Sequence, residues 1–202
     1  MLTARIAVLV SGGGTNLQAL IDCQVRGGLK SGGLSLVIAD KAGVGAIGRA
    51  ESAGIPCQVI PRREPDFEGK VLSALEAHRI DMVVLAGFLG ILSGGFVRRF
   101  PGPIINIHPA LIPSFCGKGF YGLRVHQAAL DYGVKVTGAT VHYVNEIPDG
   151  GKIILQKAVD VLPGDTPEML QRRVMEQAEW VLLPQAAELV AAQIVREKEN
   201  TL

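Results

Sequence analysis

Three polar side chains in this sequence are of the types that move protons and stabilise negative charge. Asn106 and His108 lie two positions apart in the largely apolar residues 104–113, and Asp149 opens an Asp-Gly-Gly motif after a later apolar stretch. Because side chains alternate across a strand, the amide and the imidazole share one face. An isolated pair of this kind is more often hydrogen-bonded core structure. The rest of the chain favours a catalytic site.

A glycine-rich turn near the N-terminus is suited to holding an anion. Ser11-Gly12-Gly13-Gly14 follows an apolar run and precedes a helix expected to begin near Thr15 or Asn16. Glycines let the backbone approach a ligand, and the free N–H groups of a helix start attract a phosphate. The motif is neither a Walker loop nor a complete G-x-G-x-x-G, because Leu17 occupies the third glycine position. We expect a phosphate here and regard Asp40 as a weak ribose candidate; the alternative is a tight turn without a ligand.

The apolar runs of the first half predict an α/β fold with a mostly parallel sheet. These runs are continuous rather than alternating, which is typical of strands covered by helices on both faces. The predicted strands are residues 5–10, 34–39, 57–60, 82–86 and 104–107, with helices between most of them. The first helix carries Leu17, Leu20 and Ile21 on its inward face, and another helix spans residues 63–80.

The second half is predicted to contain a long loop, further helices and two strands. In order these are the loop 109–123, a helix from Val125 to about Tyr132, strands at 135–144 and 152–161, and a last helix from about 166 to 197. Residues 145–151 join the two strands as a functional loop. Pro184 is expected to break or kink the last helix.

The composition limits the class of protein. A chain of 202 residues can bury roughly 70% of its unfolded surface. A net charge of +1 with 48% hydrophobic residues does not favour a nucleic-acid partner. Three widely spaced cysteines without a C-x-x-C pair predict neither disulfides nor a zinc site. Because the N-terminal apolar run is too short for a signal or a membrane span, we expect a cytoplasmic protein without a membrane partner.

Four segments resemble, in order along the chain, the phosphoribosylglycinamide formyltransferase family. They are residues 11–18, 86–93, 106–113, and 141–143 leading to 149–151. The combination N-x-H-P…D-G-G is specific to the formyltransferase fold, and the similarity covers nearly the whole chain. The resemblance implies one α/β formyltransferase domain over residues 1–202, with a Rossmann-like N-terminal half and helices on both faces of a twisted sheet. Residues 1–100 would form the phosphate-binding half, and residues 101–202 the catalytic and folate-binding half.

The resemblance also implies a reaction. Members of the family transfer the formyl group of 10-formyltetrahydrofolate to the amine of glycinamide ribonucleotide, a step of de novo purine biosynthesis. They use no metal. The partners implied are small-molecule substrates, and the chain would act as a monomer or homodimer.

Asn106, His108 and Asp149 are the catalytic residues that the resemblance implies. Attack of an amine on a formyl carbon creates an oxyanion, to which Asn106 can donate a hydrogen bond. A protonated His108 can stabilise the same oxygen and supply a proton. A neighbouring carboxylate favours the imidazolium, so Asp149 is expected to raise the pKa of His108 and to relay protons.

The resemblance places both substrates as well. The ribonucleotide phosphate maps to Gly14, Thr15 and Asn16, and the ribose to Glu179. The folate-binding residues are expected to be Arg63, Leu89, Gly90, Ile91, Leu92, Asn106, Asn145, Glu146, Ile147, Pro148 and Asp149.

The sequence departs from the family pattern in three places. Many members have arginines, associated with the glutamate tail of folate, where this chain has Gly90 and Glu64, so Arg62 or Arg63 is expected to make that contact. The loop 114–122 is longer than in the commonest members, and Glu179-Trp180 replaces a Glu-His pair. His126 and His142 match family positions and are interpreted as supporting residues.

Other functions remain possible at this point. A transfer-RNA formyltransferase would need a further domain and a basic surface. A formyltetrahydrofolate deformylase typically has a regulatory domain and a second histidine where Pro109 stands. A non-catalytic nucleotide-binding module has no use for the three catalytic candidates. A metal hydrolase built on His108, His142 and Asp149 lacks the i, i+4 spacing of a helical metal site.

Overall fold

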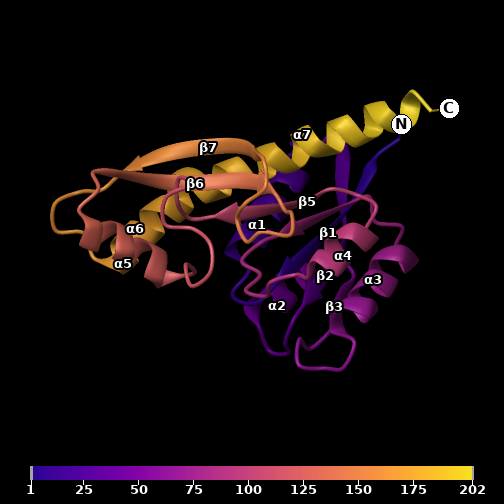
Figure 1. The fold of residues 1–202 in the computed structure, drawn as a ribbon. Helices are drawn as coiled ribbons and strands as arrows, with labels where there is room; N and C mark the ends of the chain where they lie inside the picture. The colour runs from indigo at the N-terminus through magenta and orange to yellow at the C-terminus, as the bar shows by residue number, and fades with distance from the viewer. Residues whose placement is uncertain (1, 202) are drawn as a thin grey trace.

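The computed structural model describes residues 2–201 and confirms the predicted α/β class (Figure 1). Seven strands form one sheet in the order β3-β2-β1-β4-β5-β6-β7. The strands are β1 (Ala4–Val10), β2 (Gly32–Ala39), β3 (Cys57–Val59), β4 (Met82–Leu85), β5 (Ile104–His108), β6 (Val136–Tyr143) and β7 (Ile153–Asp160). The first five pair in parallel, and β6 and β7 add two antiparallel ladders.

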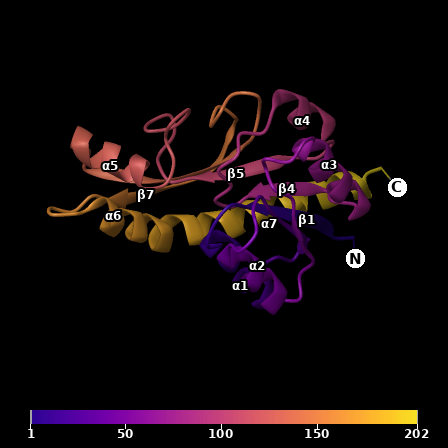
Figure 2. The ribbon, with the colours of Figure 1, turned by 90° about the horizontal axis from the view of Figure 1, so that it is seen from below.

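Helices cover both faces of this sheet (Figure 2). They are α1 (Thr15–Val25), α2 (Gly45–Ser52), α3 (Phe67–Ala77), α4 (Gly94–Arg99), α5 (Leu123–Tyr132), α6 (Pro167–Val174) and α7 (Trp180–Glu199). Helices α1, α2 and α7 contribute to one apolar cluster, and α3 and α4 to a second. Strand residues point alternately into the two clusters, as the continuous apolar runs predicted.

The predicted inward face of α1 is confirmed. Leu17 and Leu20 are fully buried, and Ile21 is 5% exposed. Gly14 precedes the helix in the left-handed region with φ 76°, a conformation that favours glycine. A Cβ at this position would lie 2.8 Å from both Cα and Cβ of Ala46 on α2, so the turn requires a residue without a side chain.

The strand order fixes where a ligand can bind. β1 and β4 are neighbours at the centre of the sheet, although two strands separate them in the sequence. Chain connections leave this point toward opposite edges, and ligands of open α/β sheets bind there, outside the carboxyl ends of the strands. The glycine turn after β1, the loop after β4 and His108 at the end of β5 all lie at this edge.

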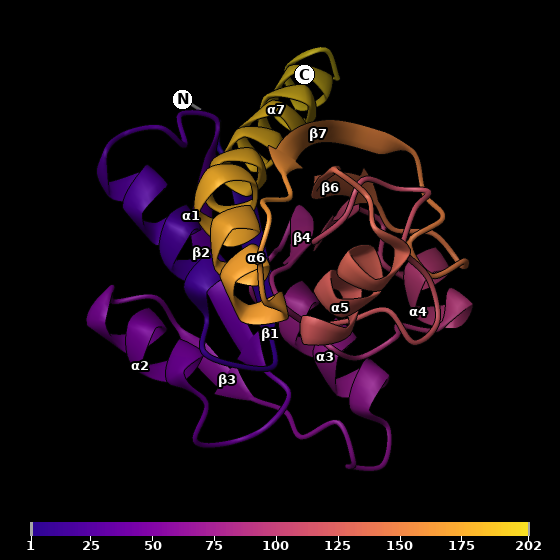
Figure 3. The same ribbon diagram turned by 90° about the vertical axis from the view of Figure 1, so that its left-hand side faces the viewer.

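The C-terminal helical region differs from its prediction. The chain continues in helical form through Pro184, and the irregularity is a π turn at Met175–Glu179, between α6 and α7 (Figure 3). A break or kink was expected at Pro184, and the helix does not break there. Pro184 cannot donate the helical hydrogen bond to the carbonyl of Trp180, and its ring crowds that carbonyl. The wider π turn ends at Glu179, the residue immediately before Trp180.

Other element boundaries shifted by a few residues. The helix predicted over residues 63–80 is confined to Phe67–Ala77, and β5 includes His108. Throughout residues 2–201, the helices are too short or too polar to cross a membrane.

Candidate active site

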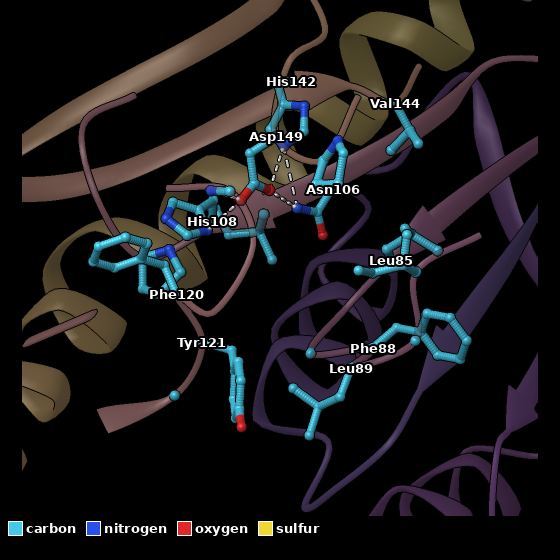
Figure 4. Close-up of a pocket in the computed structure, with 18 of the residues that line it drawn as sticks. Leu85, Phe88, Leu89, Asn106, His108, Phe120, Tyr121, His142, Val144 and Asp149 are labelled. Atoms are coloured by element: carbon cyan, nitrogen blue, oxygen red, sulfur yellow. Dashed lines mark hydrogen bonds and ion pairs between the residues drawn. The ribbon is translucent and has the colours of Figure 1, made fainter. Parts of the chain in front are cut away.

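A cleft of about 600 Å³ lies at this edge of the sheet. Its walls come from the start of α1, the loop after β4, the end of β5, the loop before α5 and the loop between β6 and β7. Figure 4 shows Asn106, His108, His142 and Asp149 grouped on one side, with Leu85, Phe88 and Leu89 opposite them. The three predicted catalytic residues therefore come together in one cleft.

Strand pairing places the polar group. Asn106 on β5 pairs with His142 on β6, so their side chains share a face. The Nδ2 of Asn106 lies 3.1 Å from Nε2 of His142 and 3.4 Å from Oδ1 of Asp149. The Nδ1 of His142 lies 2.8 Å from the carbonyl oxygen of Tyr143. Because a carbonyl only accepts, the proton of a neutral His142 is on Nδ1, and its Nε2 accepts from Asn106.

His108 is buried between a loop carbonyl and a carboxylate. Its Nε2 lies 2.8 Å from the carbonyl oxygen of Phe115, and its Nδ1 lies 3.5 Å from Oδ2 of Asp149. By the same argument Nε2 carries a proton in the neutral ring. A second proton would therefore reside on Nδ1, which faces the carboxylate.

The turn at residues 149–151 requires the two glycines of the Asp-Gly-Gly motif. Asp149 itself has φ 56°, and its Oδ2 accepts the backbone N–H of Gly117 at 2.8 Å. A Cβ on Gly151 would lie 1.7 Å from the carbonyl oxygen of Tyr143, and a Cβ on Gly150 would lie 2.7 Å from Ile147. The two glycines thus let the loop fold back tightly enough to bring Asp149 to the histidines.

Asp149 acts to raise the pKa of His108, as expected, but the net pKa of His108 is lowered. Burial, the largest influence, lowers this pKa below its ordinary value, although Asp149 and the carbonyl of Phe115 act in the opposite direction. His108 is only 4% exposed, and a buried imidazolium loses its hydration. The substrate-free site therefore favours a neutral His108.

Asp149 remains an ionised carboxylate. Burial alone would raise its pKa, but the nearby rings of His142 and His108 and the N–H of Gly117 together lower it below the ordinary value. An ionised carboxylate beside a neutral imidazole is available to accept a proton at neutral pH.

At the other end of the cleft lie the residues predicted to bind the ribonucleotide. Thr15, Asn16 and Glu179 line the cleft, and Gly14 forms the turn behind them. The Nδ2 of Asn16 donates to Oε2 of Glu179 at 2.7 Å, whereas Oδ1 of Asn16 is buried without a partner among residues 2–201. The π turn ends on Glu179 and so aims this carboxylate at the start of α1. Burial raises the pKa of Glu179 to about 6, and the bond from Asn16 opposes that rise.

Most of the predicted folate-binding residues line the opposite part of the cleft. They are Leu89, Gly90, Ile91, Leu92, Asn106, Asn145, Glu146, Ile147, Pro148 and Asp149. Arg62 and Arg63 are both exposed, and neither is among the lining residues. Arg62 lies beside a lining residue, since its Cδ is 3.2 Å from the place that a Cβ on Gly90 would occupy.

Several contributors to the site were not predicted. The carbonyl of Phe115 and the N–H of Gly117 are backbone groups of the long loop, and sequence carries no signal for them. His142 was assigned a supporting role, yet it contacts both Asn106 and Asp149. Strand pairing between β5 and β6 would have revealed it, had the register been known.

Within residues 2–201, no cluster of three or more His, Cys, Asp or Glu side chains is placed to hold a metal ion.

The sequence and the fold both match those of known proteins. The formyl transferase family matches residues 4–186. This chain belongs to the formyl transferase family. The resemblance inferred from the sequence motifs is therefore confirmed, and the fold of the family agrees with the sheet described above.

Named relatives cover nearly all of the chain. The trifunctional purine biosynthetic protein adenosine-3 of Homo sapiens is 47% identical over 201 residues, 98% of this chain. The chain spans only 19% of the length of that relative. The phosphoribosylglycinamide formyltransferase of Haemophilus influenzae is 37% identical, with 97% of this chain and 91% of the relative covered.

A solved structure agrees closely with this fold. Glycinamide ribonucleotide transformylase 1 from Symbiobacterium toebii superposes with a TM-score of 0.87 at 40% identity. The match covers 95% of this formyl transferase chain and 89% of the solved one.

Proposed function

We propose that this formyl transferase moves the formyl group of 10-formyltetrahydrofolate onto the amine of glycinamide ribonucleotide. The products are formylglycinamide ribonucleotide and tetrahydrofolate. The observation that carries the proposal is the convergence of Asn106, His108 and Asp149 between a glycine turn suited to phosphate and an apolar wall suited to a pterin. The names of relatives such as the Haemophilus influenzae enzyme support the choice of substrates.

The reaction begins with attack on the formyl carbon. The lone pair of the amine forms the new C–N bond, and the carbonyl electron pair moves onto the formyl oxygen. Asn106 stabilises this oxygen by donating an N–H bond, which replaces its long 3.4 Å contact to Asp149. The bond from Asn106 to His142 at 3.1 Å holds the amide in place.

Proton transfer then allows the folate to leave. Asp149, which is ionised in the substrate-free site, takes the proton from the new ammonium. The electron pair on oxygen re-forms the carbonyl as the bond to the folate nitrogen breaks. That nitrogen receives a proton, for which Nδ1 of His108, facing Asp149 at 3.5 Å, is the relay.

Each substrate has its own anchor in this proposal. The phosphate binds at Gly14, Thr15 and Asn16, and Glu179 accepts from the ribose. The pterin lies against residues 89–92 and the loop 145–149. All of these residues come from one chain, so a monomer or either half of a homodimer would hold a complete site.

We further propose that the transfer needs no metal. The protein should be dialysed exhaustively against a chelator and then mixed with glycinamide ribonucleotide and 10-formyltetrahydrofolate. Mass spectrometry of the nucleotide should reveal the added formyl group at an undiminished rate. Loss of activity that is restored by adding back a divalent metal would favour the metal-hydrolase alternative instead.

A further inference from the structure

His126 on α5 is a buried histidine that the proposed mechanism does not use. It is 1% exposed, and neither of its ring nitrogens has a hydrogen-bond partner among residues 2–201. Its side chain also lines the cleft. A buried imidazole without partners is costly, because it has lost its bonds to water. A ligand in the cleft is positioned to supply the missing partner.

The position of α5 indicates which substrate this is. α5 packs against α6, whose C-terminal end continues into the π turn that carries Glu179 (Figure 3). Gln171 on α6 and Met175 in the π turn also line the cleft. The apolar residues 85–92 approach from the other side of the sheet edge. His126 therefore faces the nucleotide end of the cleft.

The chemistry of the ring narrows the group that it can bind. Burial, with the nearby His108 adding to it, lowers the pKa of His126 to about 4, so the ring is neutral at physiological pH. A neutral imidazole offers one N–H donor and one acceptor nitrogen. Such a ring matches an uncharged amide or hydroxyl and does not match a phosphate, which prefers a cation or several N–H groups.

We propose that His126 binds the nucleotide substrate directly, through the glycinamide amide or a ribose hydroxyl. The orphaned Oδ1 of Asn16 is a second acceptor at the same end of the cleft and needs a donor of the same kind. His126 thus becomes a specificity residue for the amine-bearing substrate, in addition to the phosphate and ribose anchors. This inference rests on the proposed function.

Titration calorimetry on His126→Phe and His126→Asn tests the inference. The phenyl ring fills the space without polar atoms, so glycinamide ribonucleotide should bind about tenfold more weakly, the usual effect of removing one hydrogen bond. Affinity for the folate substrate should stay close to that of the wild type. Asparagine keeps one donor and one acceptor and should recover part of the lost affinity. His78→Phe is the matched control, because His78 bonds to Gln58 and does not line the cleft.

A third ligand separates the two candidate groups. Ribose 5-phosphate lacks the glycinamide amide, so a loss of its affinity in His126→Phe assigns the contact to a hydroxyl, and an unchanged affinity assigns it to the amide. Unchanged binding of glycinamide ribonucleotide to both variants, or equal losses for nucleotide and folate, overturns the inference. Failure of the wild-type protein to bind glycinamide ribonucleotide would instead contradict the proposed function itself.

Discussion

Nδ1 of His108 and Oδ2 of Asp149 lie 3.5 Å apart in the candidate active site. The opposite nitrogen of His108 is held by the carbonyl of Phe115, so the only position for an added proton faces the carboxylate. Burial keeps the pKa of His108 low, and Asp149 counteracts this. The pair is thus arranged to exchange a proton during the reaction rather than to rest as a permanent ion pair.

Removing either member of this pair should abolish most turnover. His108→Ala and Asp149→Asn are each expected to lower kcat by about 10²-fold or more, the usual contribution of a positioned acid or base. Asparagine tolerates the positive φ at position 149, so this variant should keep the fold. Steady-state kinetics and a thermal melt check the two expectations. Asp131→Asn, an exposed change on α5, is the control. A variant retaining more than about a tenth of the activity would rule out the assigned role.

The buried His126 should make the protein less stable as the pH falls. Its folded pKa is about 4 against an ordinary 6.5, so between these values the unfolded chain binds a proton that the folded chain does not. Stability is therefore lost as pH falls through this window, by on the order of 3 kcal/mol. Glu179, whose pKa is raised to about 6, acts in the opposite direction below that pH.

Comparing two proteins isolates the histidine. The difference in the free energy of unfolding between His126→Asn and the wild type should shift by about 3 kcal/mol in favour of the variant as the pH falls from 6.5 to 4. Glu179 is present in both proteins, so its contribution cancels. Denaturant titrations across this window measure the difference, and a pH-independent difference would mean that His126 titrates normally.

The glycine turn can be tested with two adjacent positions. Gly14→Ala places a methyl group 2.8 Å from Ala46 at a positive φ, which displaces the backbone proposed to bind phosphate. Gly13→Ala is the matched control, because its Cβ would meet nothing within 4 Å. Calorimetry should detect weaker binding of glycinamide ribonucleotide to the first variant alone, with folate binding unchanged in both. Retained nucleotide affinity in Gly14→Ala would place the phosphate elsewhere.

Arg62, rather than Arg63, should contact the glutamate tail of the folate. Neither arginine lines the cleft, but the stem of Arg62 lies beside Gly90, which does. Arg62→Ala should weaken polyglutamylated folate relative to the monoglutamate by about two- to fivefold, since an exposed ion pair contributes at most about 1 kcal/mol. Arg63→Ala should leave the preference unchanged. Identical preferences in both variants would exclude Arg62 from the tail site.

Much of the fold was predictable because continuous apolar runs indicate strands that are buried on both faces of the sheet. The runs that became β1, β2 and β4 contain almost no polar residue, and a parallel sheet under helices is the arrangement that accommodates them. The convergence of Asn106, His108 and Asp149 in one cleft was predictable from residue types and from the resemblance. Helix ends were less predictable, since tertiary packing decides them, and the π turn before Pro184 is one example.

The electrostatics of the site were not predictable from sequence. The sequence places His108 near Asp149 but does not reveal how deeply the ring is buried, and burial decides the direction of its pKa. The same limit applies to His126, whose orphaned nitrogens depend on how α5 packs. Backbone partners such as Gly117 require the folded loop.

The central claim is that the formyl group is transferred to an amine and is not released to water. Purified protein should be mixed with 10-formyltetrahydrofolate in the presence and absence of glycinamide ribonucleotide, and the formation of tetrahydrofolate should be followed. We expect tetrahydrofolate only when the amine is present, with one formylglycinamide ribonucleotide formed for each. Equal rates of tetrahydrofolate formation with and without the amine would make the protein a hydrolase and refute the proposed transfer.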